Sequence, residues 1–466
     1  MFTLTPVNSL GNAAEPDNEP LKSVSELIEY FHDAGKPESE FRVGTELEMI
    51  GVSTGDDLGA AVPYGGGRGV RAILDSLTEH DWQPVREGET VIALSKGDEA
   101  VTIEPGGQLE LASRPVKTNN ETREDFARFF EQLSGPSAEF KLGWLGLGFR
   151  PWGTLGDVPW MPKRRYDIMR EYLPTRGKLA HEMMKRTATV QTNLDFGSAA
   201  DAKSKFRCSM SVTSILTALY ANSGVSDGKI NGYQSYRSRI WRDTDPDRCG
   251  LLEFAWGDGD LFEQYVQWAL DVPLFFIHRG DYIFADGFTF RKFMDEGFRD
   301  YRATMDDWVL HLSTLFPEAR LKRFIEVRSC DSGSAEMVLA LGPLCRGFLY
   351  SDTACSEATA LTAHMNFDQR NELVLEVARR GLAAKVPGKK YTVRDLAAEL
   401  VAIADDGLSS CCDPTERAYL DPLRQIADSG RSQADQFIDM WNQTDGDPRV
   451  LIQAVGLPGL GGLPNV

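Results

Sequence analysis

The chain has 466 residues, 42% of them hydrophobic, which is enough to bury a sizeable core as one large domain or two fused ones. The formal net charge of −19 at pH 7 argues against broad binding of nucleic acids or of an anionic membrane surface. No apolar run reaches the ~18 residues that a membrane-spanning helix needs. We therefore expect neither a nucleic-acid partner nor a membrane partner.

Cysteine and histidine usage argues against metal-binding motifs built on sulfur or imidazole. The seven cysteines include no C-x-x-C pair and no zinc-like spacing, so reduced thiols in a cytoplasmic protein are expected. The six histidines include no H-E-x-x-H or comparable pair, which argues against a zinc hydrolase. Residues 1–20 lack the basic-then-apolar order of a signal peptide and predict a flexible acidic leader.

Secondary-structure signals can be followed in chain order. A first helix is expected over residues 25–34, because Gly35 and Lys36-Pro37 follow it. Residues 41–113 have the pattern of strands and turns, and their Gly-rich loop 64–69 is expected to begin a helix. Later helices are expected over 120–133, 166–172, 199–221 and 262–270. Later strands are expected over 143–149, 187–196, 274–278 and 324–330.

The order of these elements predicts the fold class. Strands come in groups rather than in regular βαβ alternation, which favours α+β. From about residue 340 onward, apolar residues recur at helical spacing. We therefore expect a core over 21–350, a helical part over 351–455 packed on its outer side, and a flexible tail over 456–466. A monomer and a homodimer are both compatible with the sequence.

Acidic residues on predicted strands carry the first signal of function. In F-R-V-G-T-E-L-E-M-I, Glu46 and Glu48 share one strand face, because side chains alternate with a period of two. In T-I-E-P-G-G-Q-L-E-L-A-S, Glu104 precedes a Pro-Gly-Gly break and Glu110 follows it. The glycines would let the backbone bend or approach a nucleotide closely.

Two later strands repeat this alternation. Gln191 and Asn193 share a face in T-A-T-V-Q-T-N-L-D-F, and Glu326 and Arg328 share a face in R-F-I-E-V-R-S. One interpretation is an antiparallel sheet with one solvated face, which is common. The other is a cation site, because carboxylates on neighbouring strands repel one another unless a cation lies between them. Oxygen ligands alone suit Mg²⁺ or Mn²⁺ rather than zinc.

Basic clusters add a signal for phosphate. The chain has no Walker A motif and no G-x-G-x-x-G, so a nucleotide would have to bind at a site made by a sheet and metal ions. Positive charge is concentrated in W-M-P-K-R-R-Y-D-I-M-R, R-T-A-T-V-Q and Y-R-S-R-I-W-R. Any one of these arginines alone is more often a solvated or structural residue. Their clustering in an acidic protein indicates recognition of phosphate or carboxylate.

Together these segments resemble the plant-type glutamate–cysteine ligase family, which is also found in many bacteria. The matching motifs occur in family order over roughly residues 40 to 350: G-T-E-L-E (44–48), I-E-P-G-G-Q-L-E-L (103–111), M-P-K-R-R-Y-D-I-M-R (161–170), R-T-A-T-V-Q-T-N-L-D-F (186–196), N-G-Y-Q-S-Y-R-S-R-I-W-R-D-T-D-P-D-R-C-G (231–250), Q-Y-V-Q-W-A-L-D-V-P (264–273) and L-F-P-E-A-R-L-K-R-F-I-E-V-R (315–328). One departure is Leu47, where plant members commonly have His.

The resemblance implies a fold and a reaction. The fold is glutamine-synthetase-like: a curved, mainly antiparallel sheet that forms a funnel, with helices packed outside. The reaction joins L-glutamate to the amine of L-cysteine through γ-glutamyl phosphate, with ATP as co-substrate, and it is the first step of glutathione biosynthesis. Mg²⁺ ions would bridge the ATP phosphates to carboxylates of the sheet. The implied partners are therefore the small molecules ATP, L-glutamate and L-cysteine.

The resemblance also assigns roles to individual residues by motif. The expected metal ligands are Glu46, Glu48, Glu104, Glu110 and Glu326, with Gln191 as a neutral ligand. The expected catalytic cations are Arg328 and Arg186, with Arg328 contacting the transferred phosphoryl group or the glutamate carboxylate. The expected ATP- and substrate-binding side chains are Lys163, Arg165, Asn193, Arg237, Arg239 and Trp241. Core packing remains an equally open role for Trp241.

Three alternatives stay open at this point. A related carboxylate–amine ligase that joins glutamate to a different amine, as in another thiol pathway, would have the same metal ligands and arginines. A guanidino-phosphotransferase would need a cysteine that activates the guanidine, and none of the seven stands out. An inactive family member that serves as a binding protein is disfavoured, because every candidate metal carboxylate is present.

Overall fold

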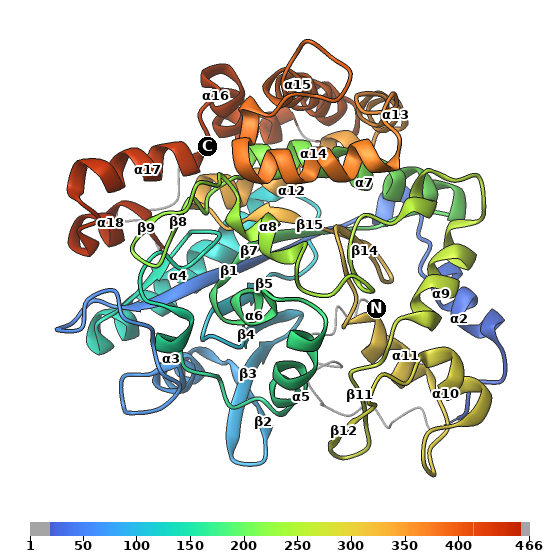
Figure 1. Ribbon diagram of the computed structural model, residues 1–466, viewed down its shortest axis with the longest axis horizontal. Helices are drawn as coiled ribbons and strands as arrows, with labels where there is room; N and C mark the ends of the chain where they lie inside the picture. The colour runs from blue at the N-terminus through green and yellow to red at the C-terminus, as the bar shows by residue number, and fades with distance from the viewer. Residues whose placement is uncertain (1–18, 413, 458–466) are drawn as a thin grey trace.

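The computed structural model describes residues 19–412 and 414–457. Its centre is a ten-stranded sheet whose main path is β14-β15-β7-β1-β5-β4-β3-β2, with β6 paired to β1 and β16 paired to β6. Every pairing in this sheet is antiparallel, so the predicted α+β class with a mainly antiparallel sheet is confirmed. Figure 1 shows helices from the C-terminal part of the chain gathered on one side of the molecule.

The strands are short except for β1, which pairs with β7, β5 and β6 along successive parts of its length. The strands of the large sheet are β1 (Val43–Ser53), β2 (Gln83–Glu87), β3 (Thr90–Lys96), β4 (Glu99–Ile103), β5 (Leu109–Ala112), β6 (Leu142–Leu145), β7 (Thr189–Leu194), β14 (Ala319–Leu321), β15 (Ile325–Asp331) and β16 (Gly456–Leu457). Three small pairs are β8 (Val225–Ser226) with β9 (Lys229–Ile230), β10 (Cys249–Gly250) with β13 (Phe316–Pro317), and β11 (Phe276–His278) with β12 (Tyr282–Phe284).

The helices surround the sheet. In chain order they are α2 (Val24–His32), α3 (Val70–Leu77), α4 (Asn119–Phe140), α5 (Arg164–Tyr172), α6 (Ala180–Arg186), α7 (Ala199–Leu219), α8 (Tyr236–Trp241), α9 (Leu261–Asp271), α10 (Phe290–Glu296), α11 (Met305–Leu312), α12 (Ala335–Leu349), α13 (Asp352–Ala360), α14 (Phe367–Arg380), α15 (Val393–Cys411), α16 (Asp421–Ser429), α17 (Gln433–Thr444) and α18 (Pro448–Val455). Within the described ranges, none of them is both long and apolar enough to cross a membrane.

Helix α7 lies between β15 and the outer helices α13, α14 and α15. It is buried along most of its length because protein covers it on several sides. Its polar side chains are satisfied locally: the Ser209 hydroxyl donates to Lys205 O at 2.8 Å, and the Thr213 hydroxyl donates to Ser209 O at 3.2 Å. One hydrophobic cluster joins Leu47 of the sheet to Leu400 of α15, so the helices after residue 350 share the core of the sheet.

Several boundaries differ from those predicted. The flexible tail was expected to begin at residue 456, but Gly456 and Leu457 form β16 and pair with Leu145 and Trp144 of β6, so this start was wrong. Residues 458–466 of the tail and 1–18 of the leader lie outside the described residues. Pro20, assigned to the leader, forms a bridge with Thr304.

Two other predictions concern helix and strand ends. The Gly-rich loop 64–69 does begin a helix, because Gly69 is the N-cap of α3. The helix expected over 120–133 continues to Phe140 and ends only at Lys141, which has left-handed backbone geometry. The strand expected over 143–149 is limited to β6, which ends at Leu145.

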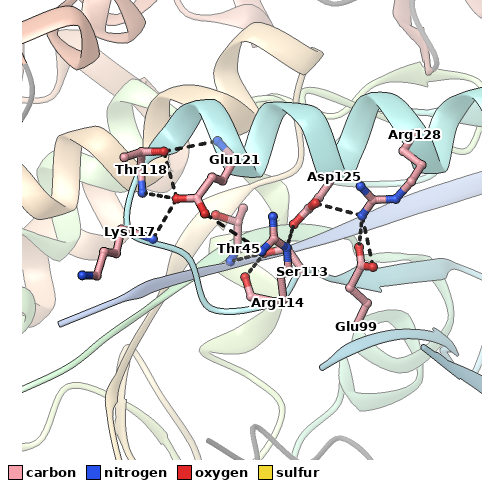
Figure 2. A network of polar contacts seen from close by, with 9 residues as sticks. All are labelled: Thr45, Glu99, Ser113, Arg114, Lys117, Thr118, Glu121, Asp125 and Arg128. Carbon is pink, nitrogen blue, oxygen red and sulfur yellow. Dashed lines mark hydrogen bonds and ion pairs between the residues drawn. The ribbon is translucent and has the colours of Figure 1, made fainter. Parts of the chain in front are cut away.

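An ion-pair network fixes α4 to the sheet (Figure 2). Asp125 of α4, whose side chain is only 1% exposed, accepts hydrogen bonds from Arg114 Nε and Arg128 Nη2, each at 2.8 Å. Arg128 also donates to Glu99 of β4 at 2.9 Å. At the start of the helix, the carboxylate of Glu121 accepts from the backbone N–H of Thr118 at 3.0 Å and forms a capping box. The network links α4 to β4 and to the segment that follows β5.

Removal of the buried charge in this network is expected to destabilise the protein. Asp125→Asn would leave Arg114 and Arg128 without their shared acceptor and should lower the free energy of unfolding by about 1–3 kcal/mol. Urea unfolding followed by circular dichroism measures this change. Asp75→Asn is the matched control, because its pair with Arg71 is an exposed i,i+4 pair that should contribute only about 0.3–0.5 kcal/mol. Equal effects of the two substitutions would contradict the assignment.

Candidate active site

One face of the large sheet borders a cavity of about 400 Å³. Side chains enter it from β1, β4, β5, β7, β14 and β15, while α5, α6, α8 and α11 supply further walls. A concave site of this size is typical of small-molecule binding, and the many acidic and basic side chains in its lining suit a charged ligand. This cavity is the candidate active site.

The strand register aligns the acidic residues on the cavity face. Glu48 of β1 is directly opposite Glu110 of β5, which is itself opposite Thr102 of β4. Glu46 of β1 is opposite Gln191 of β7. Residues directly opposite one another in antiparallel strands point to the same side, so these side chains form two adjacent rows.

A third row crosses β7, β15 and β14. Asn193 is opposite Glu326, and Glu326 is opposite Arg320. Asn193 Nδ2 donates to Glu46 Oε1 at 2.8 Å and thereby connects this row to its neighbour. The predicted alternation on all four strands is thus present, and it brings Glu46, Glu48, Glu110, Gln191 and Asn193 to one cavity.

Neutral groups donate hydrogen bonds to three of the carboxylates, of which Glu46 receives the one from Asn193 described above. Glu110 accepts from the Thr102 hydroxyl at 2.6 Å, and Glu48 accepts from the backbone N–H of Thr189 at 3.1 Å. Burial, followed by the nearby Glu326 and Glu110, raises the pKa of Glu46 to about 7. Burial and the neighbouring Glu104 also raise the pKa values of Glu48 and Glu110. Like charges gathered in a buried site favour protonation or the arrival of a cation.

The donor chemistry fits a hard divalent cation. Ion pairs among the described residues include none to Glu46, Glu48, Glu104 or Glu110, so these carboxylates lack a positive partner within the protein. Carboxylate and amide oxygens are the ligands that Mg²⁺ takes. Among the described residues, no three His, Cys, Asp or Glu side chains are arranged so that they could hold a metal ion by themselves. A bound ion would need Gln191, water or substrate phosphates to complete its coordination.

Glu326 differs from the other carboxylates. It is completely buried, and it accepts from Arg320 Nη2 at 2.8 Å, from Lys322 Nζ at 3.2 Å and from Arg328 Nη1 at 2.7 Å. Burial opposes ionisation, but these three cations hold the pKa of Glu326 well below its usual range. Its expected role as a metal ligand therefore conflicts with its contacts, because both oxygens are already used by protein cations.

Several predicted binding residues enter the cavity without an anionic partner. Lys163 is buried, and burial lowers its pKa to about 8, while its ammonium lies 5.2 Å from the ring centroid of Tyr166. Arg165 lines the same wall and has a buried Nε without a hydrogen-bond partner. Arg237 Nη2 donates to Arg328 O at 3.0 Å. Trp241 lines the cavity with a buried Nε1 that has no partner, so packing does not satisfy its indole N–H.

Two predicted residues do not reach the cavity. Arg186 is buried elsewhere: Nη1 contacts Asp227 at 2.8 Å and Glu182 at 3.1 Å, and Nη2 donates to Gly153 O at 2.9 Å. Arg186 is the last residue of α6, so the strand alternation that brings Thr189 and Gln191 to the cavity does not extend to it. The assignment of Arg186 as a catalytic cation is therefore corrected to a structural role.

Arg239 is the second of these residues. Its Nη2 pairs with Asp243 at 3.0 Å, and it is absent from the cavity lining. Arg237 and Trp241 of the same helix are four positions apart and both face the cavity, so Arg239, midway between them, is directed elsewhere. The expectation that Arg239 binds substrate is corrected accordingly.

The sequence interpretation missed other lining residues. Arg320 and Lys322 enter the cavity from β14 and the turn after it. Their period-two spacing in E-A-R-L-K-R-F was the available signal. Met169, Met183 and Met184 line an apolar wall, but apolar residues on helices look the same whether they face a core or a cavity.

The Pro-Gly-Gly segment is a tight hairpin between β4 and β5. Gly107 N donates to Glu104 O at 2.9 Å, and Gly107 has a φ of +84°, which favours glycine. A Cβ on Gly106 would lie 2.0 Å from Lys185 O. The close approach expected toward a nucleotide is therefore made instead to the backbone of α6. The hairpin positions Glu104 at the cavity end of β4.

Comparisons with known proteins agree with one another. The family model described as Glutamate-cysteine ligase family 2 (GCS2) matches residues 42–454. The chain is 37% identical over 429 residues to the chloroplastic glutamate–cysteine ligase of Medicago truncatula, covering 91% of this chain and 83% of that protein. It is 38% identical over 429 residues to the corresponding protein of Brassica juncea, covering 91% and 82%. A glutamate–cysteine ligase from Francisella tularensis, solved with AMP, has the same fold with a TM-score of 0.57, 12% identity, and coverage of 89% of this chain and 87% of that chain.

Proposed function

The chain belongs to glutamate–cysteine ligase family 2, and from that membership we propose that the cavity on the large sheet is where the γ-carboxylate of L-glutamate is joined to the amine of L-cysteine. The activity is that of a glutamate–cysteine ligase, an ATP-dependent enzyme that catalyses the first step of glutathione biosynthesis. The choice of this site rests on the register of β1, β5 and β7, which aligns Glu46, Glu48, Glu110 and Gln191 at one cavity.

Both reactants of the first chemical step are anionic. The γ-carboxylate of glutamate attacks the γ-phosphorus of ATP, which forms γ-glutamyl phosphate and releases ADP. The amine of cysteine then attacks the acyl carbon and displaces phosphate, which leaves an amide bond. No enzyme nucleophile takes part, so the task of the site is to neutralise and align charge.

Magnesium is the proposed metal ion, with Glu46, Glu48, Glu104 and Glu110 as its candidate ligands; Gln191 is a neutral candidate that would have to give up the hydrogen bond that its Oε1 accepts from Arg328. When bound, Mg²⁺ would supply positive charge to the ATP phosphates and template their orientation. The uncompensated carboxylates and their raised pKa values support this assignment. Manganese has the same preference for oxygen ligands and is an alternative at the same residues.

Arg328 is the proposed cation for the transferred phosphoryl group or the glutamate carboxylate. Its Nη1 contacts Glu326 Oε2 at 2.7 Å and Gln191 Oε1 at 2.5 Å, so the guanidinium is held rigidly at the cavity floor. Glu326 would therefore act as a positioning residue for Arg328. A preorganised cation costs little reorganisation when negative charge moves during the reaction.

The remaining cavity side chains are proposed to bind the substrates. Lys163 and Arg165 lie on one wall near Glu104 and would contact phosphates, because they have no carboxylate partner of their own. Arg237 and the indole N–H of Trp241 would contact carboxylate groups of the amino-acid substrates. Asn193 would orient Glu46 through the hydrogen bond between them.

Phosphate release in the presence of ATP, Mg²⁺ and L-glutamate tests the proposal, with each amino acid offered in turn as the acceptor. Turnover that depends strictly on cysteine, with γ-glutamylcysteine identified by mass spectrometry, is the expected result. Turnover with a different amine and none with cysteine would move the assignment to a related carboxylate–amine ligase with the same metal site.

Magnesium affinity is expected to increase with pH between 6 and 8. In the metal-free protein the pKa of Glu46 is about 7, against its ordinary value of 4.5, so the folded state holds a proton that the unfolded chain has already lost. Ionisation of Glu46 therefore costs stability as pH rises through 7, and Mg²⁺ should offset that cost. The increase in Tm produced by Mg²⁺ should be larger at pH 8 than at pH 6.

The control for this pH dependence is Glu46→Gln, which removes the titrating group and should flatten the difference in Tm between pH 6 and pH 8. An increase in Tm that is equal at pH 6, 7 and 8 in the unmodified protein would contradict the role of Glu46.

Cellular location and assembly remain predictions. The plant relatives carry the word chloroplastic in their names, whereas a cytoplasmic location is what we propose for this chain from its cysteine usage. A monomer or a homodimer is proposed as the assembly.

A further inference from the structure

A pair of neighbouring thiols lies at the end of α15, away from the cavity. Cys411 is the last residue of that helix, and Cys412 follows it with an extended backbone. The two Sγ atoms are 2.8 Å apart, which is within hydrogen-bonding distance. Cys411 is exposed and Cys412 is half-buried, so a small reagent can reach the pair from solvent.

The surroundings favour a thiolate on Cys411. The hydrogen bond from Cys412 lowers the pKa of Cys411, and the guanidinium of Arg346 acts in the same direction, while burial opposes both. The pair therefore holds its protons unequally, with Cys411 as the more acidic thiol. Thiolates are the nucleophilic and ligating form of cysteine.

We propose that Cys411 and Cys412 form a vicinal-dithiol site that binds trivalent arsenic in a cyclic dithiolate. For an organoarsenical of the form R–As(OH)₂, Cys411 Sγ forms the first As–S bond and Cys412 Sγ forms the second. Two As–O bonds and two S–H bonds break, and two water molecules leave. Arsenic remains trivalent, so the step needs no oxidant or reductant.

The number of ligands discriminates against zinc. A structural zinc site needs four ligands, and the described residues contain no group of three His, Cys, Asp or Glu side chains that could hold a metal ion. Pyramidal arsenic needs only the two sulfur ligands that this pair provides.

The other thiols lack this combination of pairing and access. Cys208, Cys330, Cys345 and Cys355 are buried. Cys249 is partly accessible but has no thiol beside it in sequence, and burial raises its pKa to about 12. The cavity proposed for ligation contains no cysteine among its lining residues. The dithiol site is therefore separate from the ligase chemistry and does not rest on it.

Phenylarsine oxide and intact-mass spectrometry of the full chain test the proposal. The expected result is one phenylarsenic group per chain, together with the loss of two titratable thiols. A dithiol such as 2,3-dimercaptopropanol should remove it, whereas an equal concentration of a monothiol should not. Cys411→Ser and Cys412→Ser should each abolish this dithiol-reversible adduct, and Cys249→Ser, the matched control, should retain it.

Three outcomes would overturn the site. They are no mass gain in the unmodified chain, an adduct retained by the Cys411→Ser Cys412→Ser double variant, and a loss of two hydrogens without arsenic. The second would place the arsenic on other thiols, such as Cys208 and Cys355, which interact with each other. The third would mean that the pair forms a disulfide instead. The serine variants should keep unmodified Tm and turnover, which separates loss of the site from loss of the fold.

Discussion

Glu110→Gln is expected to lower kcat by roughly 10³-fold while leaving the fold intact. Glu110 lies between Glu48 and Thr102 across the strands and forms no ion pair with a described residue, so its charge is available to a metal ion. Glutamine keeps the size and the hydrogen bond to Thr102 but removes the charge. Steady-state phosphate release measures kcat, and a titration with Mg²⁺ should show that the variant requires a higher concentration.

Glu99→Gln is the matched control for this substitution. Glu99 also belongs to the β4–β5 region and is buried, but it pairs with Arg128 on the side of α4 (Figure 2). Its replacement should affect stability more than turnover. If Glu110→Gln retained near-normal kcat and Mg²⁺ dependence, the proposed metal site on β1 and β5 would be wrong.

Glu326→Gln is expected to affect both stability and catalysis. The substitution would leave Arg320, Lys322 and Arg328 close together without the carboxylate that they share. Removing one member of a buried ion pair costs about 3–5 kcal/mol, because the remaining charges are no longer compensated. The free energy of unfolding should fall by that amount. The value of kcat should also fall, because Arg328 loses the ion pair that fixes its position.

Chemical denaturation and steady-state kinetics together measure the two effects of Glu326→Gln. Glu416→Gln provides the comparison, because Glu416 is also a buried carboxylate and pairs with Arg346 far from the cavity. That variant should lose stability and keep kcat once folded. A Glu326→Gln variant with unmodified stability would show that the three cations do not depend on this carboxylate.

Alternation along strands made much of the site predictable. Glu46, Glu48, Glu110, Gln191 and Asn193 were assigned to polar strand faces from a period of two, and register then brings these faces together. The α+β class followed from the grouping of strands, and the mainly antiparallel sheet followed from the family resemblance. These predictions succeeded because alternation along a strand is a local property that tertiary packing preserves.

The ion-pair partners of the charged side chains were not predictable in the same way. Glu326 looks like Glu46 in sequence, yet Arg320 lies directly opposite it on β14 and neutralises it. Arg186 lies in a family motif beside β7, but its ion pair with Asp227 joins segments 41 positions apart. Such pairings depend on the three-dimensional neighbourhood, which no local pattern records. Helix ends, such as that of α4 at Phe140, depend in the same way on packing.

The arrangement of β1 has a consequence for how the protein acquires its structure during synthesis. Glu46 bonds to a residue 147 positions later, and the backbone of Glu48 accepts from Ser332, 284 positions later. Contacts of such long range form slowly, because the chain must lose conformational entropy to close a long loop before the contact can stabilise the fold. A growing chain therefore leaves the part of β1 that pairs with β7 open until β7 has been made, and β7 in turn waits for β15. Open strand edges invite association between chains, so we expect the nascent protein to be most prone to association at β1, the strand that carries Glu46 and Glu48.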